Sequence, residues 1–450
     1  MNRFKINLQC FALFFSLFYF FNQDITWAVT PSVKTTEHSI ALKSDGSVWA
    51  WGVNESGQLG NGTTTDSSVP VQVKDSSGTG FLTNITAIST NTGFGGHSVA
   101  LKSDGTVWAW GNNYRGQLGN GTTGVTPNPL PVQVKDSSGT GFLTNIIAID
   151  AGSNYVIALK NDGTVWGWGE CGSGQIGTGH TGWYNLPQQV VDSSGTGFLT
   201  NIIAIDAGAE HTVALKNDGT VWAWGGNIYY KLGDSTNVTR TLPVQVKDPS
   251  DGSTFLTGVS AIAAGQDSTV VLKSDGTVWA WGHNLVGNLG DGTTTDRINP
   301  VQVKDTSGTG FLTGISAIAA SNGHIQSEHV IALKNDGTVF TWGFNGRGQL
   351  GNGTTTGGTP NPLPVQVKDP TGTSFLTGVS SITAGTFHSI AVKSDGSVLA
   401  WGKNDGYNLL DGTVVQKTLP VYSNIQLYFP NATTLAATSI TTTSATLNAT

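Results

Sequence analysis

One stretch occurs seven times in this chain and constrains its fold more than any other feature. In one copy it runs from Leu101 to Gly111 and reads Leu-Lys-Ser-Asp-Gly-Thr-Val-Trp-Ala-Trp-Gly. The other copies begin at Leu42, Leu159, Leu215, Leu272, Leu333 and Val392. Successive copies are 56 to 61 residues apart. A fixed period of this size indicates a repeat architecture, in which each repeat forms one supersecondary unit.

Each copy predicts a β-hairpin. An alternating run such as Ser98–Lys102 leads into Asp-Gly and continues as Thr106–Gly111. We expect Asp-Gly to supply the positive φ angles of the turn. Trp108 and Trp110 then share one face of their strand, because side chains alternate along a strand. Twelve of the 14 tryptophans occupy these two positions, and we expect them to fill the core between neighbouring sheets rather than to stack on a ligand.

Two further strands complete each repeat. The run Pro131–Val134 begins with proline, which is tolerated at strand starts and edges, so we place it outermost. The run Ala148–Gly152 is rich in small residues, so we place it innermost, near a crowded axis. Four strands in each of seven repeats predict an all-β fold, a seven-bladed β-propeller of four-stranded antiparallel blades. An open solenoid is the alternative, but it needs distinct polar caps at both ends.

We expect the ring to be closed by strands from both ends of the chain. The first repeat lacks a convincing Ala-Ile-x-Ala-Gly strand before His38. The last repeat is followed by an extra strand-like run, Asn424–Phe429. This run, or one near it, is predicted to complete the first blade, and the propeller is predicted to span residues 29–430.

The two ends of the chain carry different signals. Residues 1–28 have the features of a secretory signal peptide: Arg3 and Lys5, then the apolar run Cys10–Phe21, then a small-x-small site at Thr26–Ala28. The apolar run is short for a membrane span, so we expect cleavage, a secreted or cell-surface protein and no membrane insertion of the mature chain. Residues 431–450 resemble the truncated start of a fibronectin type III-like domain, or a linker, which suggests a piece of a longer protein.

Charge and cysteine content narrow the classes of function. The net charge is −7, which argues against a nucleic-acid surface. Outside the signal-like segment the chain has a single cysteine, Cys171, so no internal disulfide is expected. A small loop residue is the favoured interpretation of Cys171 over a reactive thiol, because no paired base accompanies it.

The repeats resemble those of the regulator of chromosome condensation family. Three linked motifs carry the resemblance over about residues 32 to 423: His97–Leu101, Asp104–Gly111 and Gly116–Gly121. The resemblance implies a seven-bladed propeller and a role in protein–protein binding. The family's founding member is a nuclear guanine-nucleotide exchange factor that binds chromatin, an activity that a signal peptide and an acidic chain argue against here. Exported bacterial propellers of similar repeat type include a β-lactamase inhibitor protein.

No motif for catalysis, a metal or a cofactor is found. Five histidines recur at one repeat position, but equivalent positions on different blades lie too far apart to share one ion. We expect them to form structural hydrogen bonds that tie neighbouring strands. These histidines are His38, His97, His211, His329 and His388. Tyr155 and Ser268 replace histidine at this position, and Phe340 and Leu399 replace the first tryptophan. We therefore expect no enzyme, no bound metal and no cofactor.

The remaining candidate site is a surface of variable loops. Following the chain up and down each blade, the turns before the histidine position and the Gly-Gln-Leu-Gly-Asn-Gly loops fall on one face, where the repeats differ. Aromatic residues and arginine anchor interfaces, and this face is predicted to gather Tyr114, Arg115, Tyr155, Trp183, Tyr184, Tyr229, Tyr230, Asp267, Phe344, Arg347, Phe387 and Tyr407. We predict a non-catalytic, monomeric propeller that binds a protein or other macromolecule here. One alternative is an inhibitor of a secreted enzyme such as a β-lactamase. Another is a carbohydrate-binding propeller, in which Trp183 and Tyr184 stack on sugars. The third is that the loops bind no partner and vary in sequence because nothing constrains them.

Overall fold

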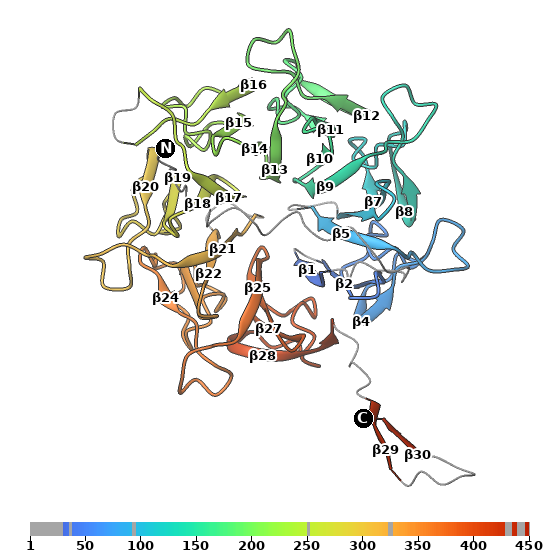
Figure 1. Ribbon diagram of the computed structural model, residues 1–450, viewed down its shortest axis with the longest axis vertical. Helices are drawn as coiled ribbons and strands as arrows, with labels where there is room; N and C mark the ends of the chain where they lie inside the picture. Colours follow the sequence, from blue (N-terminus) through green and yellow to red (C-terminus); the bar gives the residue numbers. More distant parts are fainter. Residues whose placement is uncertain are drawn as a thin grey trace, which may run out of the picture.

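The computed structural model describes residues 30–35, 38–91, 96–249, 253–322, 327–427, 434–438 and 446–449. Seven four-stranded antiparallel sheets stand as blades around a central axis (Figure 1), which confirms the predicted seven-bladed propeller. The predicted signal peptide lies outside the described residues. Of the segment predicted to be fibronectin-like, only the hairpin β29 (Thr434–Thr438) and β30 (Thr446–Ala449) is described, and the domain assignment stays a prediction.

The four strands of each blade are consecutive in the sequence and run from the axis to the rim. The innermost strands are β1 (Ser32–Thr35), β5 (Ile85–Thr90), β9 (Ile146–Ala151), β13 (Ile202–Ala207), β17 (Val259–Ala264), β21 (Ile315–Ala320) and β25 (Val379–Ala384). The second strands are β2 (His38–Leu42), β6 (His97–Lys102), β10 (Tyr155–Lys160), β14 (His211–Lys216), β18 (Ser268–Lys273), β22 (His329–Lys334) and β26 (His388–Lys393).

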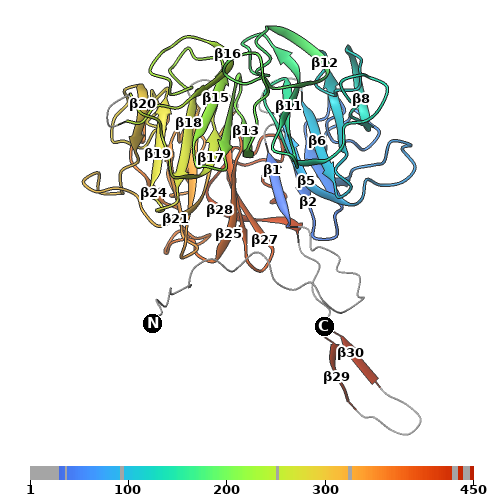
Figure 2. The same cartoon turned by 45° about the horizontal axis from the view of Figure 1, so that its top comes forward.

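The third strands carry the repeated tryptophans, and the outermost strands form the rim (Figure 2). The third strands are β3 (Val48–Gly52), β7 (Val107–Asn113), β11 (Val165–Cys171), β15 (Val221–Gly225), β19 (Val278–Gly282), β23 (Val339–Gly343) and β27 (Ser397–Gly402). The outermost strands are β4 (Ser67–Gln72), β8 (Gly124–Gln133), β12 (Gly182–Gln189), β16 (Arg240–Gln245), β20 (Arg297–Gln302), β24 (Val365–Gln366) and β28 (Lys417–Gln426). Both placements made from the sequence, small residues innermost and Pro-Val-Gln outermost, are confirmed.

The hairpin between the second and third strands differs from the expected turn in one detail. Only its glycine takes a positive φ, 78° at Gly105. Asp104 instead accepts hydrogen bonds at Oδ1 from the backbone N–H and the hydroxyl of Thr106, at 3.0 and 2.6 Å. The aspartate therefore caps the turn with its side chain, and the glycine alone supplies the left-handed conformation.

The core lies between the blades, and the second tryptophan of each repeat fills it. Trp110 is fully buried against Ile40 and Ala50 of the preceding blade. Its indole N–H donates to the carbonyl oxygen of Gln58 at 2.8 Å. A Cβ at Gly60 would lie 2.8 Å from that indole nitrogen, so glycine is required beside the ring. The predicted packing of tryptophans between neighbouring sheets is confirmed for this position.

The first tryptophan of each repeat lies nearer the surface than we expected. Trp108 is half-buried, and the Lys102 ammonium lies 5.0 Å from its ring centroid. The same lysine-over-tryptophan contact recurs at Trp49, Trp166, Trp222 and Trp279. The replacements at this position, Phe340 and Leu399, are buried.

The predicted closure of the ring is wrong in its strand pairing. The first blade is completed by its own innermost strand, β1, and the run beginning at Asn424 continues β28 of the last blade. The two blades are joined by packing instead, because Val33 and Trp51 share a core cluster with Leu427. The carbonyl oxygen of Leu427 also accepts a hydrogen bond from the Ser44 N–H at 3.0 Å. In the part of the chain that the structure describes, no helix is long and apolar enough to cross a membrane.

Candidate interaction face

The strand order puts two sets of loops at the same end of every blade. These are the turns between innermost and second strands and the loops between third and outermost strands, as predicted, and we call this end the variable face. Backbone hydrogen bonds join the two sets, for example from Asn112 N–H to the Gly96 carbonyl at 2.9 Å. The Asp-Gly hairpins and the connections between blades form the opposite face.

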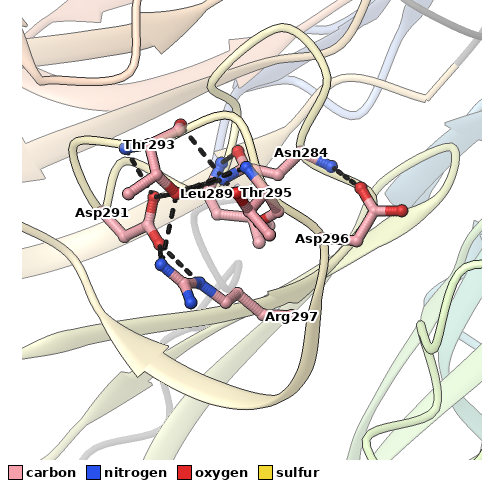
Figure 3. A network of polar contacts seen from close by, with 7 residues as sticks. All are labelled: Asn284, Leu289, Asp291, Thr293, Thr295, Asp296 and Arg297. Carbon is pink, nitrogen blue, oxygen red and sulfur yellow. Dashed lines mark hydrogen bonds and ion pairs between the residues drawn. The ribbon is translucent and has the colours of Figure 1, made fainter.

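In six of the seven repeats, a buried asparagine holds the loop between the third and outermost strands in shape. In the fifth blade, Asn284 Oδ1 accepts a hydrogen bond from the Leu289 N–H at 3.0 Å (Figure 3). Its Nδ2 donates to Asp291 Oδ1 and to the carbonyl oxygens of Thr293 and Thr295, each at 3.1 Å. One side chain thus fixes a turn of more than ten residues, so the loop is ordered before any partner arrives.

Charged groups tighten the same loop. Arg297 donates from Nε to Asp291 Oδ2 at 2.7 Å, and Asp296 Oδ1 accepts from the Asn284 N–H at 2.9 Å (Figure 3). Asparagine stands at the equivalent place in six of the seven repeats: Asn54, Asn113, Asn227, Asn284, Asn345 and Asn404. In the remaining repeat the place is taken by Cys171, which is buried and donates from Sγ to the His180 carbonyl at 3.4 Å. Burial raises the pKa of the Cys171 thiol, which fits the structural interpretation of this residue.

Replacing this asparagine tests the role of the loop clamp. Asn284→Ala is expected to lower the free energy of unfolding by about 2 kcal/mol, because it leaves the buried Leu289 N–H without an acceptor. The measurement is urea denaturation. Asn217→Ala, in an exposed hairpin, is the matched control and should change stability by less than about 0.5 kcal/mol. Equal losses in the two variants would contradict the assigned role.

The structure brings together three predicted residues from two neighbouring blades. The Arg115 guanidinium lies 4.9 Å from the ring centroid of Tyr114 and 5.1 Å from that of Trp183. Its Nε lies 3.9 Å from Glu170 Oε1, and Asn154 holds the other oxygen of Glu170 at 3.0 Å. Tyr114 and Trp183 are 55% and 59% exposed, so the cluster presents a large aromatic surface to solvent. We call Tyr114, Arg115, Glu170 and Trp183 the Arg115 cluster.

Two other predicted residues adopt a conformation that bulky side chains avoid. Tyr230 and Tyr407 have φ angles of 65° and 59°. Other repeats have glycine at this place, such as Gly57 with φ of 80°. A bulky residue in this region is strained, and such strain gathers at functional sites. Tyr407 is 40% exposed on the variable face.

Tyr155 and Asp267 are not surface residues, contrary to the sequence-based prediction. Tyr155 is fully buried and donates from its hydroxyl to the His211 carbonyl at 2.6 Å, because it occupies the repeat position of the buried histidines. Asp267 is nearly buried and forms an ion pair with Lys231 at 2.7 Å. Neither side chain is available to a partner in this structure.

The remaining predicted residues lie on loops of other blades, except Tyr184, which follows Trp183 in the sequence. Tyr184 shares a hydrogen bond with the Thr178 hydroxyl at 3.1 Å. The rings of Tyr229 and His283 lie 4.4 Å apart, and the Lys403 ammonium lies 5.3 Å from the ring of Phe387. On the loop after β23, Phe344 is half-buried and Arg347 is exposed.

A buried acid on this face, Glu328, was not among the residues predicted from the sequence. Glu328 accepts hydrogen bonds from the Ser268 hydroxyl at 2.7 Å and from Asn288 Nδ2 at 3.0 Å. Burial, and to a lesser extent the charge of Asp267, raises the pKa of Glu328 to about 8. The signal was present in the sequence, because an acid also precedes the histidine position at Glu210 and Asp267.

Four of the five recurring histidines form the predicted structural hydrogen bonds, and these bonds join neighbouring blades, whereas neither ring nitrogen of His97 has a hydrogen-bond partner among the described residues. His38 Nε2 lies 2.7 Å from the Ser98 hydroxyl, and His329 Nε2 lies 2.8 Å from that of Ser389. Burial lowers the pKa of His38, His97, His329 and His388 to about 3. Over the described ranges, no three His, Cys, Asp or Glu side chains are grouped so as to hold a metal ion.

Comparisons with known proteins find the same repeat. A model of the RCC1-like domain matches residues 86–443, and a model of the regulator of chromosome condensation (RCC1) repeat matches residues 45–101. The ultraviolet-B receptor UVR8 of Arabidopsis thaliana is 30% identical over 384 residues, which is 85% of this chain and 79% of that protein. The human E3 ubiquitin-protein ligase HERC2 is 27% identical over 83% of this chain, but the match spans only 7% of HERC2.

Solved structures agree on the fold. Human WBSCR16 superposes with a TM-score of 0.67 at 19% identity, covering 87% of this chain and 96% of that one. Prp20p from Saccharomyces cerevisiae gives a TM-score of 0.66 at 21% identity, covering 85% of this chain and 87% of that one. At these identities the likeness concerns the fold alone.

Proposed function

The chain belongs to the family of RCC1-like domains, and on that premise we propose that it is a non-catalytic, monomeric propeller that binds a protein through its variable face. The observation that carries this proposal is the Arg115 cluster. Arginine, tyrosine and tryptophan are the residues most often responsible for binding energy at interfaces. Here the exposed rings of Tyr114 and Trp183 flank Arg115, on one loop that the buried Asn113 holds in shape and on the neighbouring loop, where Cys171 takes the place of the asparagine.

Rigid aromatic anchors support binding on energetic grounds. The guanidinium of Arg115 is already stacked between two rings, so little side-chain entropy remains to be lost on association. Tyr230 and Tyr407 add to the argument, because a strained aromatic residue persists where glycine would be easier. The occupant is a protein, because the anchors are spread over the loops of several blades rather than gathered in one small pocket.

The proposed location of the protein outside the cell is inferred from its sequence. The signal-like segment favours export, so the partner is proposed to be a secreted or cell-surface protein. An inhibitor of a secreted enzyme is the more specific form of the same proposal, since the variable face would then cover the active site of that enzyme. The net charge of −7 argues against nucleic acid. The activities named for UVR8 and HERC2 belong to those proteins, and guanine-nucleotide exchange is not proposed.

A carbohydrate is the second candidate ligand, favoured by one observation. Trp183 is 59% exposed, and Tyr184 follows it at the start of β12. Exposed aromatic rings can stack on the apolar faces of sugars. Binding to a glycan array that is lost in Trp183→Ala, without capture of any protein, would favour this alternative.

The test compares the two faces of the propeller. The full chain is used to capture proteins from the secreted and surface fraction of its source, and the affinity for the recovered partner is then measured. Arg115→Ala combined with Trp183→Ala should weaken binding by about 30-fold to about 1,000-fold, since one anchor typically contributes about 2 kcal/mol and two contribute up to about 4 kcal/mol. Phe142→Ala, on the opposite face at 52% exposure, is the matched control and should bind normally. Normal binding by the double variant would refute the assignment of the site.

A further inference from the structure

The charges on the opposite face of the propeller are close to balance. Lysine and aspartate occur together there, as Lys102 and Asp104 do in a hairpin and Lys135 and Asp136 do in a connection between blades. Over the described residues, this pattern places twelve lysines and thirteen aspartates on the opposite face. That face therefore has almost no net charge with which to select a partner.

The variable face, in contrast, has an excess of unpaired acids. Six of the seven cations that the structure describes there form ion pairs with acids of the same face, at N–O distances of 2.6 to 3.9 Å. The seventh cation, Arg347, is exposed and has no ion pair with the described residues. Four surface acids, Glu55, Asp66, Glu210 and Asp296, also have none. Four unpaired carboxylates thus stand against one unpaired arginine.

Three of these acids flank the Arg115 cluster. The blades follow one another around the ring in sequence order (Figure 1), and the cluster is formed by the blades of β7 and β11. Glu55 and Asp66 lie on the loop between β3 and β4 of the preceding blade, and Glu210 lies in the turn before β14 of the following blade. Arg347 lies farther around the ring, on the loop after β23. The exposed aromatic rings of the cluster therefore have unpaired negative charge on both sides.

Neutral donors hold two of the flanking carboxylates in place. Asp66 Oδ1 accepts a hydrogen bond from the Asn54 N–H at 2.8 Å, and Glu210 Oε2 accepts one from the Ser173 hydroxyl at 3.4 Å. The carboxylate of Glu55 is exposed and has no hydrogen bond or ion pair with the described residues. Because the donors carry no net charge, they orient the two carboxylates without cancelling their charge.

The variable face is open to a partner as large as a protein. The propeller begins where Ser32 pairs with Leu42, beside the first hairpin. It ends at Leu427, whose carbonyl accepts a hydrogen bond from the N–H of Ser44 in the same hairpin at 3.0 Å. Both ends of the propeller thus lie on the opposite face, below the blades in Figure 2. A partner on the variable face meets neither of them.

We propose that the protein bound at the Arg115 cluster presents a basic surface, with lysine or arginine side chains opposite Glu55, Asp66 and Glu210. This inference rests on the proposed function and adds the chemistry of the partner to it. At an interface, central aromatic and arginine anchors contribute most of the binding energy. Complementary charges around them accelerate association and disfavour partners of the wrong sign.

The test selects peptides from a random display library on the immobilised full chain at about 50 mM NaCl, where attraction between charges is weakly screened. Peptides with a net positive charge should be enriched. They should no longer bind to the double variant with Arg115→Ala and Trp183→Ala. Raising the NaCl concentration to about 500 mM should slow the association of a selected peptide at least about tenfold, because salt screens the attraction that guides encounter.

A triple variant tests the three acids directly. Glu55→Gln, Asp66→Asn and Glu210→Gln together should slow association at least about fivefold and leave dissociation nearly unchanged, because charges around an interface act mainly on the rate of encounter. The matched control removes three exposed hairpin carboxylates from the opposite face, has the same net charge and should associate at the normal rate. Its substitutions are Asp104→Asn, Asp162→Asn and Asp218→Asn.

The outcomes separate this inference from the proposed function. Enrichment of neutral or acidic peptides would overturn the inference, as would equal association rates for the triple variant and its control. The proposed function survives either result if binding still requires Arg115 and Trp183. Both are refuted if no peptide is enriched, or if the enriched peptides bind the double variant normally.

Discussion

The protein is expected to lose stability steeply as the pH falls from about 6.5 to about 4.5, because five buried histidines must stay neutral in the fold. Burial lowers the pKa of four of them to about 3, and that of His211 well below its usual value. The unfolded chain takes up protons near pH 6.5, while the folded chain does not. The unfolded state therefore binds more protons in this window, and stability rises with pH.

Two buried acids act in the opposite direction. The pKa values of Asp206 and Glu328 are raised to about 8, so the folded state holds two protons that the unfolded state releases above about pH 4.5. Five histidines outnumber two acids, which leaves a net uptake of three protons on unfolding. The free energy of unfolding should fall by about 4 kcal/mol per pH unit below pH 6.

Urea denaturation in EDTA across this pH range measures the slope. His38→Gln removes one titrating group and should lower the slope by about 1.4 kcal/mol per pH unit. A free energy of unfolding that stays constant from pH 7 to pH 5 would contradict the buried, neutral state of the histidines.

Trp281→Ala is expected to lower the free energy of unfolding by about 3–5 kcal/mol, the usual loss for a buried tryptophan. Trp281 is fully buried against Val221 and Ala223 of the preceding blade, and its indole N–H donates to the Lys231 carbonyl at 2.9 Å. The substitution leaves a cavity between two blades and removes one of the two donors to that carbonyl, the other being the Thr269 hydroxyl at 2.8 Å.

Trp183→Ala provides the comparison within the same chain. Trp183 lies 59% exposed on the variable face, and its loss should change stability by less than about 0.5 kcal/mol. Denaturant midpoints of the two variants measured side by side give the result. Similar losses in both would mean that the tryptophans between blades do not form the core.

The repeat allowed the fold to be predicted, because seven copies of one hairpin report the same strand pattern seven times. The prediction was wrong where the first and last blades meet, because that junction occurs once and no other repeat shows how it is built. The strand β1 has the sequence Ser-Val-Lys-Thr. It lacks the Ala-Gly signature, because Lys34 and Thr35 are the last two residues of this innermost strand. The run at Asn424 looked like a spare strand but extends β28.

The site was predicted in part, because residue type indicates what a side chain can do but not whether it is exposed. Arg115 and Trp183 are 68 positions apart in sequence and meet only because neighbouring blades align their loops. Tyr155 looked like an anchor, although its repeat position is a core position. The ion pair of Lys231 with Asp267 joins two blades, and nothing local in the sequence indicates it.

Hydrogen exchange of the complex with the captured partner tests the central claim most directly. The claim is that the partner covers the variable face at the Arg115 cluster. The prediction is slowed exchange in residues 112–117 and 170–184, which carry the cluster, with unchanged exchange in residues 102–106 and 136–142 of the opposite face. Slowed exchange confined to residues 102–106 and 136–142 would contradict it and would place the binding surface on the face of the Asp-Gly hairpins.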